Sequence, residues 1–279
     1  GEDIDLSAYD ALGEVIKYDF STAEEAAVRS VDADVLVLNK VEVNEKTIGN
    51  ASHLKLVCVT ATGTNNLDKA YLEKRGIAWR NVAGYSTESV TQHTFAMLFY
   101  LLEKLPYYDR YVKDEKYIGD KMFTHFDKHF GELAKMTWGI IGRNSQPGYE
   151  RVSFEELLKE SDIVSVHAPL DENTLDLMNK EAFHQMKKTA IFLNLGRGPI
   201  VVEEDLAEAL EQDEIAAAGL DVLRVEPMSP ENPLRRIKDS EKLLITPHIA
   251  WASVEARTRL MEIICGQIQE FFSNGSPES

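Results

Sequence analysis

Four residues able to do chemistry follow successive apolar segments in the second half of the chain: Arg197, Asp221, Glu226 and His248. A guanidinium binds a carboxylate through two parallel hydrogen bonds, and an imidazole can transfer a proton near neutral pH. A neighbouring carboxylate such as that of Glu226 could orient the imidazole and favour its charged form. Together the four residues are typical of a site that transfers a proton next to a bound anion.

The segments around these residues read as strand, turn, helix, strand, loop and strand, a pattern that predicts a parallel sheet. Residues past the carboxyl ends of such strands meet in one crevice, where ligands bind. Each residue alone has a simpler interpretation, because Arg197 could lie in a solvated turn and His248 could be a packing residue. Their occurrence at successive strand ends favours a functional site.

Three segments resemble the signature sequences of the D-isomer-specific 2-hydroxyacid dehydrogenases. They are N-L-G-R-G at 194–198, G-L-D-V at 219–222 followed by Glu226 and Pro227, and T-P-H-I-A-W-A-S at 246–253. The family includes D-lactate, glycerate (hydroxypyruvate) and phosphoglycerate dehydrogenases. The resemblance runs through nearly the whole chain, and the segments occur in the family's order.

The resemblance implies a role for each matching residue. Arg197, Glu226 and His248 would be the catalytic residues, and Asp221 would contact the nicotinamide carboxamide. The Thr62–Gly63 turn could present backbone N–H groups to an anion, although it could also be a plain loop. The family places the substrate carboxylate at this turn, and the implied substrate-binding residues are Ala61, Thr62 and Gly63. The other implied cofactor-binding residues are Gly142, His167, Pro169, Thr174, Leu195 and Gly196.

The implied reaction is hydride transfer between NAD and C2 of a small D-2-hydroxy or 2-oxo acid. Glycerate/hydroxypyruvate is the first expectation and D-lactate/pyruvate the next, and NADP stays open as the cofactor. The family also implies a homodimer. Two alternatives use the same scaffold: a dinucleotide-sensing or interaction protein without turnover, and an inactive deletion variant.

Composition narrows the class of protein. The 279 residues carry a formal net charge of −17, which argues against nucleic acid or an anionic membrane as a partner. No apolar run approaches the length of a membrane span, and the two cysteines lie in apolar contexts typical of reduced packing residues. We therefore expect a cytoplasmic protein. His125 and His129 have helical metal-ligand spacing but no recognisable third ligand, so we expect no metal site.

The whole chain predicts an α/β fold of two domains with parallel sheets. Strand-like apolar runs occur at 35–38, 56–59 and 77–79. Helices are expected from 21 to 29, with Ser21 as the cap, and from 89 to 105. Residues 153–156 form a capping-box pattern. We expect a flavodoxin-like substrate domain at 1–103, with the C-terminal helix 254–279 packing back on it. A Rossmann-type dinucleotide-binding domain would occupy 104–253.

The dinucleotide domain is incomplete in the sequence. The apolar strand Trp138–Gly142 opens such a domain, but it continues R-N-S-Q-P-G, with Asn144 and Pro147 where glycines of the phosphate-binding loop belong. About one β-α-β step is missing before Tyr149, and the family's first strand is missing before the segment that starts at Gly1. Either these segments are absent from this sequence only, or the protein is a genuine deletion variant that binds cofactor poorly. We expect the loss of an interior strand to split a sheet.

Overall fold

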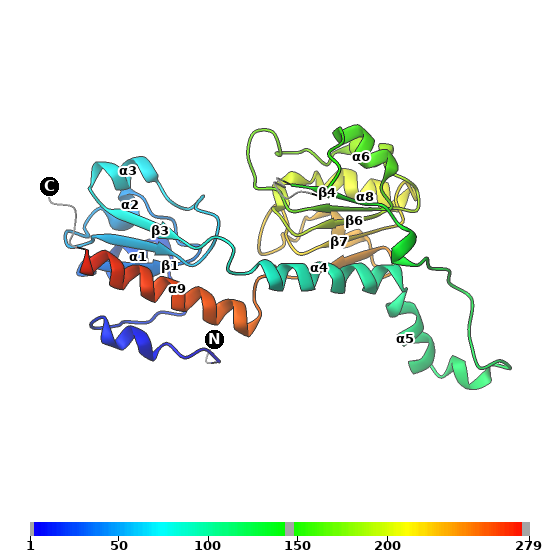
Figure 1. Ribbon diagram of the computed structural model, residues 1–279, viewed down its shortest axis with the longest axis horizontal. Helices are drawn as coiled ribbons and strands as arrows, with labels where there is room; N and C mark the ends of the chain where they lie inside the picture. Colours follow the sequence, from blue (N-terminus) through cyan, green and yellow to red (C-terminus); the bar gives the residue numbers. More distant parts are fainter. Residues whose placement is uncertain (1–2, 143–147, 275–279) are drawn as a thin grey trace. The chain divides into compact units, whose positions relative to one another are not determined.

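The computed structural model describes residues 3–142 and 148–274 and forms two compact units. One unit consists of Gly1–Ser89 with Trp251–Ser279, and the other of Val90–Ala250. Each contains one parallel sheet with helices, so the expected α/β class is confirmed (Figure 1). The boundaries between the two units fall before Val90 and after Ala250. The sequence predicted domain boundaries after residue 103 and after residue 253.

The first unit is built on a three-stranded parallel sheet with the order β1-β2-β3, formed by Val35–Leu38, Leu56–Val59 and Ala78–Asn81. Successive side chains of the fully buried β2 point to opposite faces of the sheet. Leu56 and Cys58 pack in a core with Leu260 and Ile264 of α9, whereas Val57 and Val59 pack in a second core on the other face. Figure 1 shows α9 lying along this sheet. The helices of the unit are η1 (Ser7–Ala11), α1 (Ala23–Arg29), α2 (Glu45–Ile48), α3 (Lys69–Lys74) and α9 (Val254–Ser273).

The cap of α1 is Thr22, so the expectation of Ser21 was wrong. The Thr22 hydroxyl accepts a hydrogen bond from the Glu25 amide, and the Glu25 carboxylate accepts one from the Thr22 amide at 2.8 Å. This reciprocal pair requires a hydroxyl three residues before the glutamate, which Thr22 satisfies and Ser21 does not. The expected cap at Ser153 is confirmed, since its hydroxyl accepts from the Glu156 amide at the start of α6.

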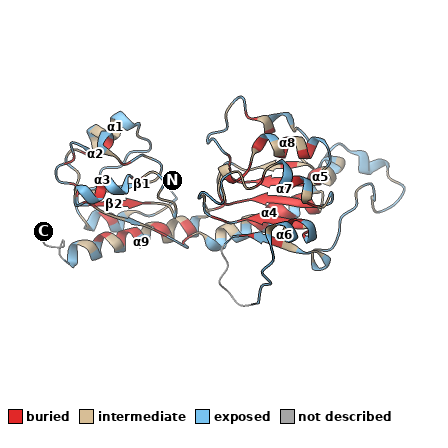
Figure 2. Ribbon diagram, turned by 90° about the horizontal axis from the view of Figure 1, so that it is seen from above, coloured by how far each residue is buried: buried red, intermediate tan, exposed pale blue. Residues whose placement is uncertain are grey.

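The second unit is built on a five-stranded parallel sheet whose strands pair in chain order, β4-β5-β6-β7-β8. One face packs on α6, α7 and α8 through residues such as Phe192 and Phe183, and the other packs on α4 through residues such as Leu193 and Leu98. Figure 2 shows the buried interior strands between these layers. The strands are Trp138–Ile141, Ile163–Val166, Ile191–Asn194, Ala217–Leu220 and Leu243–Ile245, and the helices are α4 (Thr87–Leu102), α6 (Phe154–Glu160), α7 (Lys180–Gln185) and α8 (Glu203–Glu211).

The sheet of the second unit is continuous, so the expectation of a split sheet was wrong. β4 pairs with β5 in register from Trp138 with Ile163, and among the described residues it lies at the sheet edge. A β-α-β step missing after β4 therefore leaves an exposed edge rather than a gap inside the sheet. Ile140 on this edge strand is 43% exposed.

An extended arm leaves the second unit after α4 (Figure 1). It contains α5 (Leu105–Lys113), η2 (Lys116–Gly119) and a return segment that ends at η3 (Leu133–Lys135). The return segment is attached to α5 where the His125 ring stacks on Tyr111 at 3.8 Å between ring centroids. His125 also lies 2.9 Å from the Tyr107 hydroxyl, with Asp120 and Asp127 beside it. No group of three metal-ligating side chains occurs in the described part of the chain.

No helix within 3–142 or 148–274 is long and apolar enough to cross a membrane.

Candidate active site

The turn after β6 is fixed by the buried amide side chain of Asn194. Its Oδ1 accepts a hydrogen bond from the Gly196 amide at 3.0 Å, and its Nδ2 donates to the Arg197 carbonyl at 3.0 Å. The Arg197 guanidinium is half-buried and donates from Nη1 to the Gly196 carbonyl at 2.8 Å. Asn194 therefore determines where the chain presents Arg197.

Gly198 lets this turn pack directly on the loop after β7. A Cβ atom at Gly198 would lie 1.9 Å from the carbonyl carbon and oxygen of Leu223, a distance that no side chain can occupy. The short helix η4 (Gly198–Ile200) begins at this contact. The backbone that carries Arg197 is thereby held against the loop that carries Glu226.

The loop after β7 is anchored by Glu203, the buried first residue of α8. Its Oε1 accepts from the Arg224 amide at 2.8 Å, and its Oε2 accepts from the Asn232 side chain at 2.9 Å, just before η5 (Pro233–Arg236). The Glu226 carboxylate folds back to accept from the Leu223 amide at 3.0 Å through Oε1. The peptide bond between Glu226 and Pro227 is cis.

The structure brings Glu226 and His248 into direct contact. Glu226 Oε2 lies 2.8 Å from His248 Nδ1, and each side chain is 29% exposed. An ionised carboxylate can only accept, so His248 donates from Nδ1. The other ring nitrogen, Nε2, is then the atom that can give a proton to a substrate.

Asp221 lies directly beneath the turn that carries His248. Its side chain is 2% exposed, and its carbonyl oxygen accepts from the His248 amide at 2.8 Å. Its carboxylate accepts from the Ile249 and Ala250 amides at 2.9 Å each and from the Thr246 hydroxyl at 2.6 Å. Three successive amides are thus directed at one residue. They hold His248 in a left-handed backbone conformation with φ of 55°.

Apart from Asp221, which follows β7, the expected cofactor-binding residues lie at the carboxyl ends of β4 and β6 and in the segment after β5. A Cβ at Gly142 would be 3.5 Å from the His167 backbone, and one at Gly196 would be 2.9 Å from the Ala168 carbonyl oxygen. Leu195 is buried in the same turn. His167 follows β5, and partial desolvation by neighbouring protein atoms lowers the pKa of its imidazole.

Thr174 shapes the loop after β5. Its hydroxyl donates to the Pro169 carbonyl at 2.8 Å and accepts from the Asp171 amide at 2.8 Å. The strand ends thus provide backbone and small side chains suited to the nicotinamide half of a dinucleotide.

The altered glycine positions Asn144 and Pro147 lie outside the described residues. Among the described residues, β4 ends at Ile141 and the next helix or strand is α6, which begins at Phe154.

The expected substrate-binding loop, Ala61, Thr62 and Gly63, follows β2 in the first unit. The Thr62 hydroxyl donates to the Val82 carbonyl at 3.1 Å, and the Thr62 carbonyl accepts from the Asn81 side chain at 2.7 Å. The loop is therefore tied to the end of β3. Its role in substrate binding stays a prediction.

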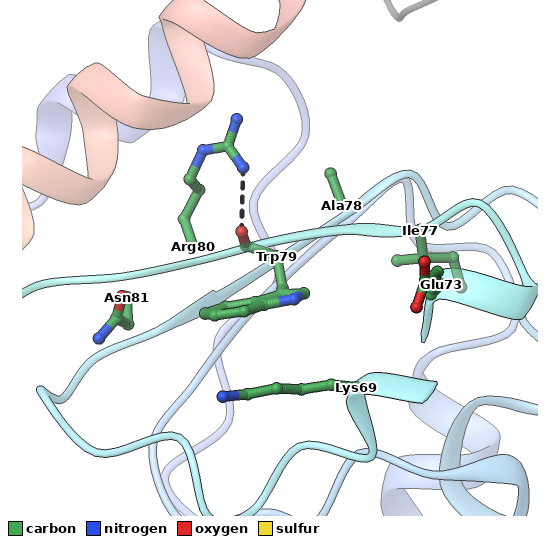
Figure 3. Close-up of a pocket in the computed structure, with 7 residues that line it drawn as sticks. All are labelled: Lys69, Glu73, Ile77, Ala78, Trp79, Arg80 and Asn81. Carbon is green, nitrogen blue, oxygen red and sulfur yellow. Dashed lines mark hydrogen bonds between the residues drawn. The ribbon is translucent and has the colours of Figure 1, made fainter. Parts of the chain in front are cut away.

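A hollow of about 670 Å³ lies beside β3 and contains none of the expected site residues (Figure 3). Figure 3 shows Trp79 and Arg80 on opposite sides of the strand, with Lys69 next to the indole ring. The Lys69 Nζ atom lies 4.7 Å from the centroid of that ring. Arg80 is turned back to donate to the Trp79 carbonyl at 3.0 Å. The two cations therefore do not converge on one ligand position.

Sequence reasoning gave no role to Asn194, Glu203 or Thr246, which hold the site together. The available signal for Asn194 was its place two residues before the Gly-Arg-Gly segment at 196–198. Glu203 begins an acidic segment, E-E-D at 203–205, yet its side chain is buried. No local pattern distinguishes it from Glu204.

Comparison with known proteins identifies the family. Residues 143–250 match the model of the D-isomer specific 2-hydroxyacid dehydrogenase NAD binding domain. The chain is 34% identical to a hydroxypyruvate reductase of Blautia hydrogenotrophica, with 99% of this chain and 94% of that protein covered. The chain belongs to the D-isomer specific 2-hydroxyacid dehydrogenase family. It is also 32% identical to a glycerate dehydrogenase of Methylorubrum extorquens, over 92% of this chain and 88% of that protein.

Solved structures of this fold are also similar. A crystal structure of a protein from Thermus thermophilus matches with a TM-score of 0.85 and 28% identity, covering 96% of this chain and 94% of that one. An acyclic imino acid reductase in complex with NADPH and D-Arg has a TM-score of 0.85 and 25% identity, covering 96% and 92%.

We expect Gly198→Ala to lower the free energy of unfolding by about 2 kcal/mol or more, because the added methyl group must push the Leu223 backbone away. Gly266→Ala in α9 is the matched control. No atom beyond the helix's own backbone lies within 4 Å of its Cβ position, so this change should raise stability by about 0.5–1 kcal/mol. Urea unfolding at 25 °C measures both. A Gly198→Ala variant as stable as the unaltered protein would show that the two loops are not packed as described.

Proposed function

We propose that the chain is an NAD-dependent oxidoreductase that interconverts small D-2-hydroxy acids and 2-oxo acids. The observation that carries the proposal is the hydrogen bond between His248 and Glu226. In the reducing direction, His248 donates its Nε2 proton to the carbonyl oxygen at C2 of the substrate. Glu226 keeps the ring oriented and stabilises its charged form. The nicotinamide supplies the hydride.

Binding of the substrate is assigned to separate groups. Arg197 holds the carboxylate and draws charge onto the carbonyl oxygen. The backbone amides of Ala61, Thr62 and Gly63 in the first unit are assigned to substrate binding, and the second unit is proposed as the dinucleotide-binding domain. Hydroxypyruvate is the first candidate substrate, supported by the names of the Blautia and Methylorubrum relatives, and pyruvate is the next.

The nicotinamide half of the cofactor is assigned to Gly142, His167, Pro169, Thr174, Leu195, Gly196 and Asp221. NAD is preferred in this proposal because the matched domain model is named for NAD binding. We also propose a cytoplasmic location, supported by two cysteines that are both free and buried.

The purified protein should oxidise NADH in the presence of hydroxypyruvate or pyruvate. His248→Ala removes the proton donor and should lower the rate about a hundredfold or more. His184→Ala is the control, because that side chain is 79% exposed and outside the site, and it should leave the rate unchanged. Full activity in the His248→Ala variant would contradict the assignment of the acid.

A fluorescence titration with NADH separates the alternatives, with Trp138 and Trp251 as reporters. Saturable binding without turnover of any 2-oxo acid would favour a dinucleotide-sensing protein. The absence of any saturable signal would favour an inactive deletion variant, as expected if the missing β-α-β step is truly lost. An intact mass would show whether that step is present in the protein.

We propose that two copies of the chain associate through the arm between α4 and β4. Seven apolar side chains of this arm are exposed to solvent. Exposed apolar patches larger than a few hundred Å² commonly mark interfaces between proteins. The seven side chains are Leu105 (49%), Val112 (57%), Ile118 (80%), Met122 (59%), Phe123 (92%), Phe126 (69%) and Phe130 (54%).

Light scattering should give a mass twice that of the chain. Phe123→Asp places a charge in this patch and should shift the mass to that of one chain, because burying an unpaired carboxylate is costly. Phe20→Asp is the control, at an apolar residue that is 75% exposed in the first unit, and it should leave the mass unchanged. A single-chain mass for the unaltered protein would contradict the proposal.

A further inference from the structure

His93 extends the hydrogen-bond network of the site onto α4. Its Nε2 lies 3.0 Å from Thr246 Oγ1 and 3.6 Å from Asp221 Oδ1. The His93 side chain is 21% exposed and the Asp221 side chain is 2% exposed. All three residues belong to the second unit, although His93 and Thr246 are 153 positions apart in the chain.

The partners fix the direction of each hydrogen bond. The Asp221 carboxylate accepts hydrogen bonds from the Ile249 and Ala250 amides, which can only donate, and from the Thr246 hydroxyl. The single hydroxyl proton of Thr246 is then given to Asp221 in the 2.6 Å hydrogen bond. Thr246 can therefore only accept from His93, and His93 must carry its hydrogen on Nε2.

This series of hydrogen bonds ends at the turn that contains His248. The Asp221 carboxylate holds the Ile249 and Ala250 amides, and the left-handed backbone of His248 depends on that turn. If the carboxylate rotated, the turn would relax and the 2.8 Å hydrogen bond between His248 and Glu226 would lengthen.

We propose that His93 is a positioning residue that acts through Thr246 and Asp221 to keep His248 aimed at the substrate. The proposal rests on the function proposed above, in which His248 donates the proton. It assigns Asp221 a role in orienting the catalytic turn, in addition to any contact with nicotinamide.

Steady-state kinetics of three variants test the proposal. His93→Leu removes the donor while keeping an apolar side chain, and should lower kcat about tenfold, the effect of losing roughly one hydrogen bond to a charged network. KM for the 2-oxo acid should stay unchanged, because Arg197 is unaffected. His93→Gln offers an N–H near the Nε2 position and should restore most of the rate. His184→Leu is the control at an exposed histidine and should behave as the unaltered protein.

NMR gives a second measurement that does not depend on turnover. In ¹⁵N-histidine-labelled protein, the ring of His93 should carry its hydrogen on Nε2. His93→Leu should also shift the Ile249 and Ala250 amide resonances, whereas His184→Leu should not.

Three results would overturn the proposal: a His93 ring protonated on Nδ1 alone, an unchanged kcat in a folded His93→Leu variant, or a rise in KM with kcat preserved. If the unaltered protein reduces no 2-oxo acid, the proposed function fails. The ring assignment and the amide shifts then still decide whether His93 orients the turn. If His93→Leu does not fold, the ring assignment alone decides.

Discussion

The buried carboxylate of Asp221 is the interaction on which the site depends. A left-handed backbone at a residue other than glycine costs on the order of 1–3 kcal/mol, and His248 is held in one. Hydrogen bonds to a charged acceptor each contribute about 1.5–3 kcal/mol, and Asp221 accepts three through its carboxylate. The network outweighs the strain, so the imidazole is oriented before any substrate binds. Such preorganisation is what makes a proton donor effective.

Three further contacts position the rest of the site. Gly198 permits backbone to pack on backbone at Leu223, and Glu203 anchors the same loop from the start of α8. Asn194 fixes the turn that presents Arg197. Each of these residues acts on the main chain of a strand end, because parallel strands bring their carboxyl ends to one edge of the sheet. The side chains of the candidate site are therefore positioned by the fold rather than by contacts with one another alone.

Much of this arrangement could be predicted from the sequence, because buried parallel strands appear as continuous apolar runs and end at turn residues. That reasoning located the strands that precede Arg197, Asp221 and His248, and it paired Glu226 with His248. It missed His93, because an imidazole on a largely apolar helix gives no local signal of a partner so distant in the chain. It also misplaced the α1 cap at Ser21. It expected a split sheet as well, because a strand's position in a sheet depends on pairing that the sequence does not display. The incomplete glycine loop stays a prediction, because Asn144 and Pro147 lie outside the described residues.

Amide hydrogen exchange at Ile249 and Ala250 tests the central claim most directly. If the Asp221 carboxylate holds the turn, both amides exchange slowly in the unaltered protein. In an Asp221→Asn variant they should exchange much faster, while amides in the interior strand β6 keep their protection. Amides at 249 and 250 that exchange in the unaltered protein as fast as those of an open loop would contradict the account.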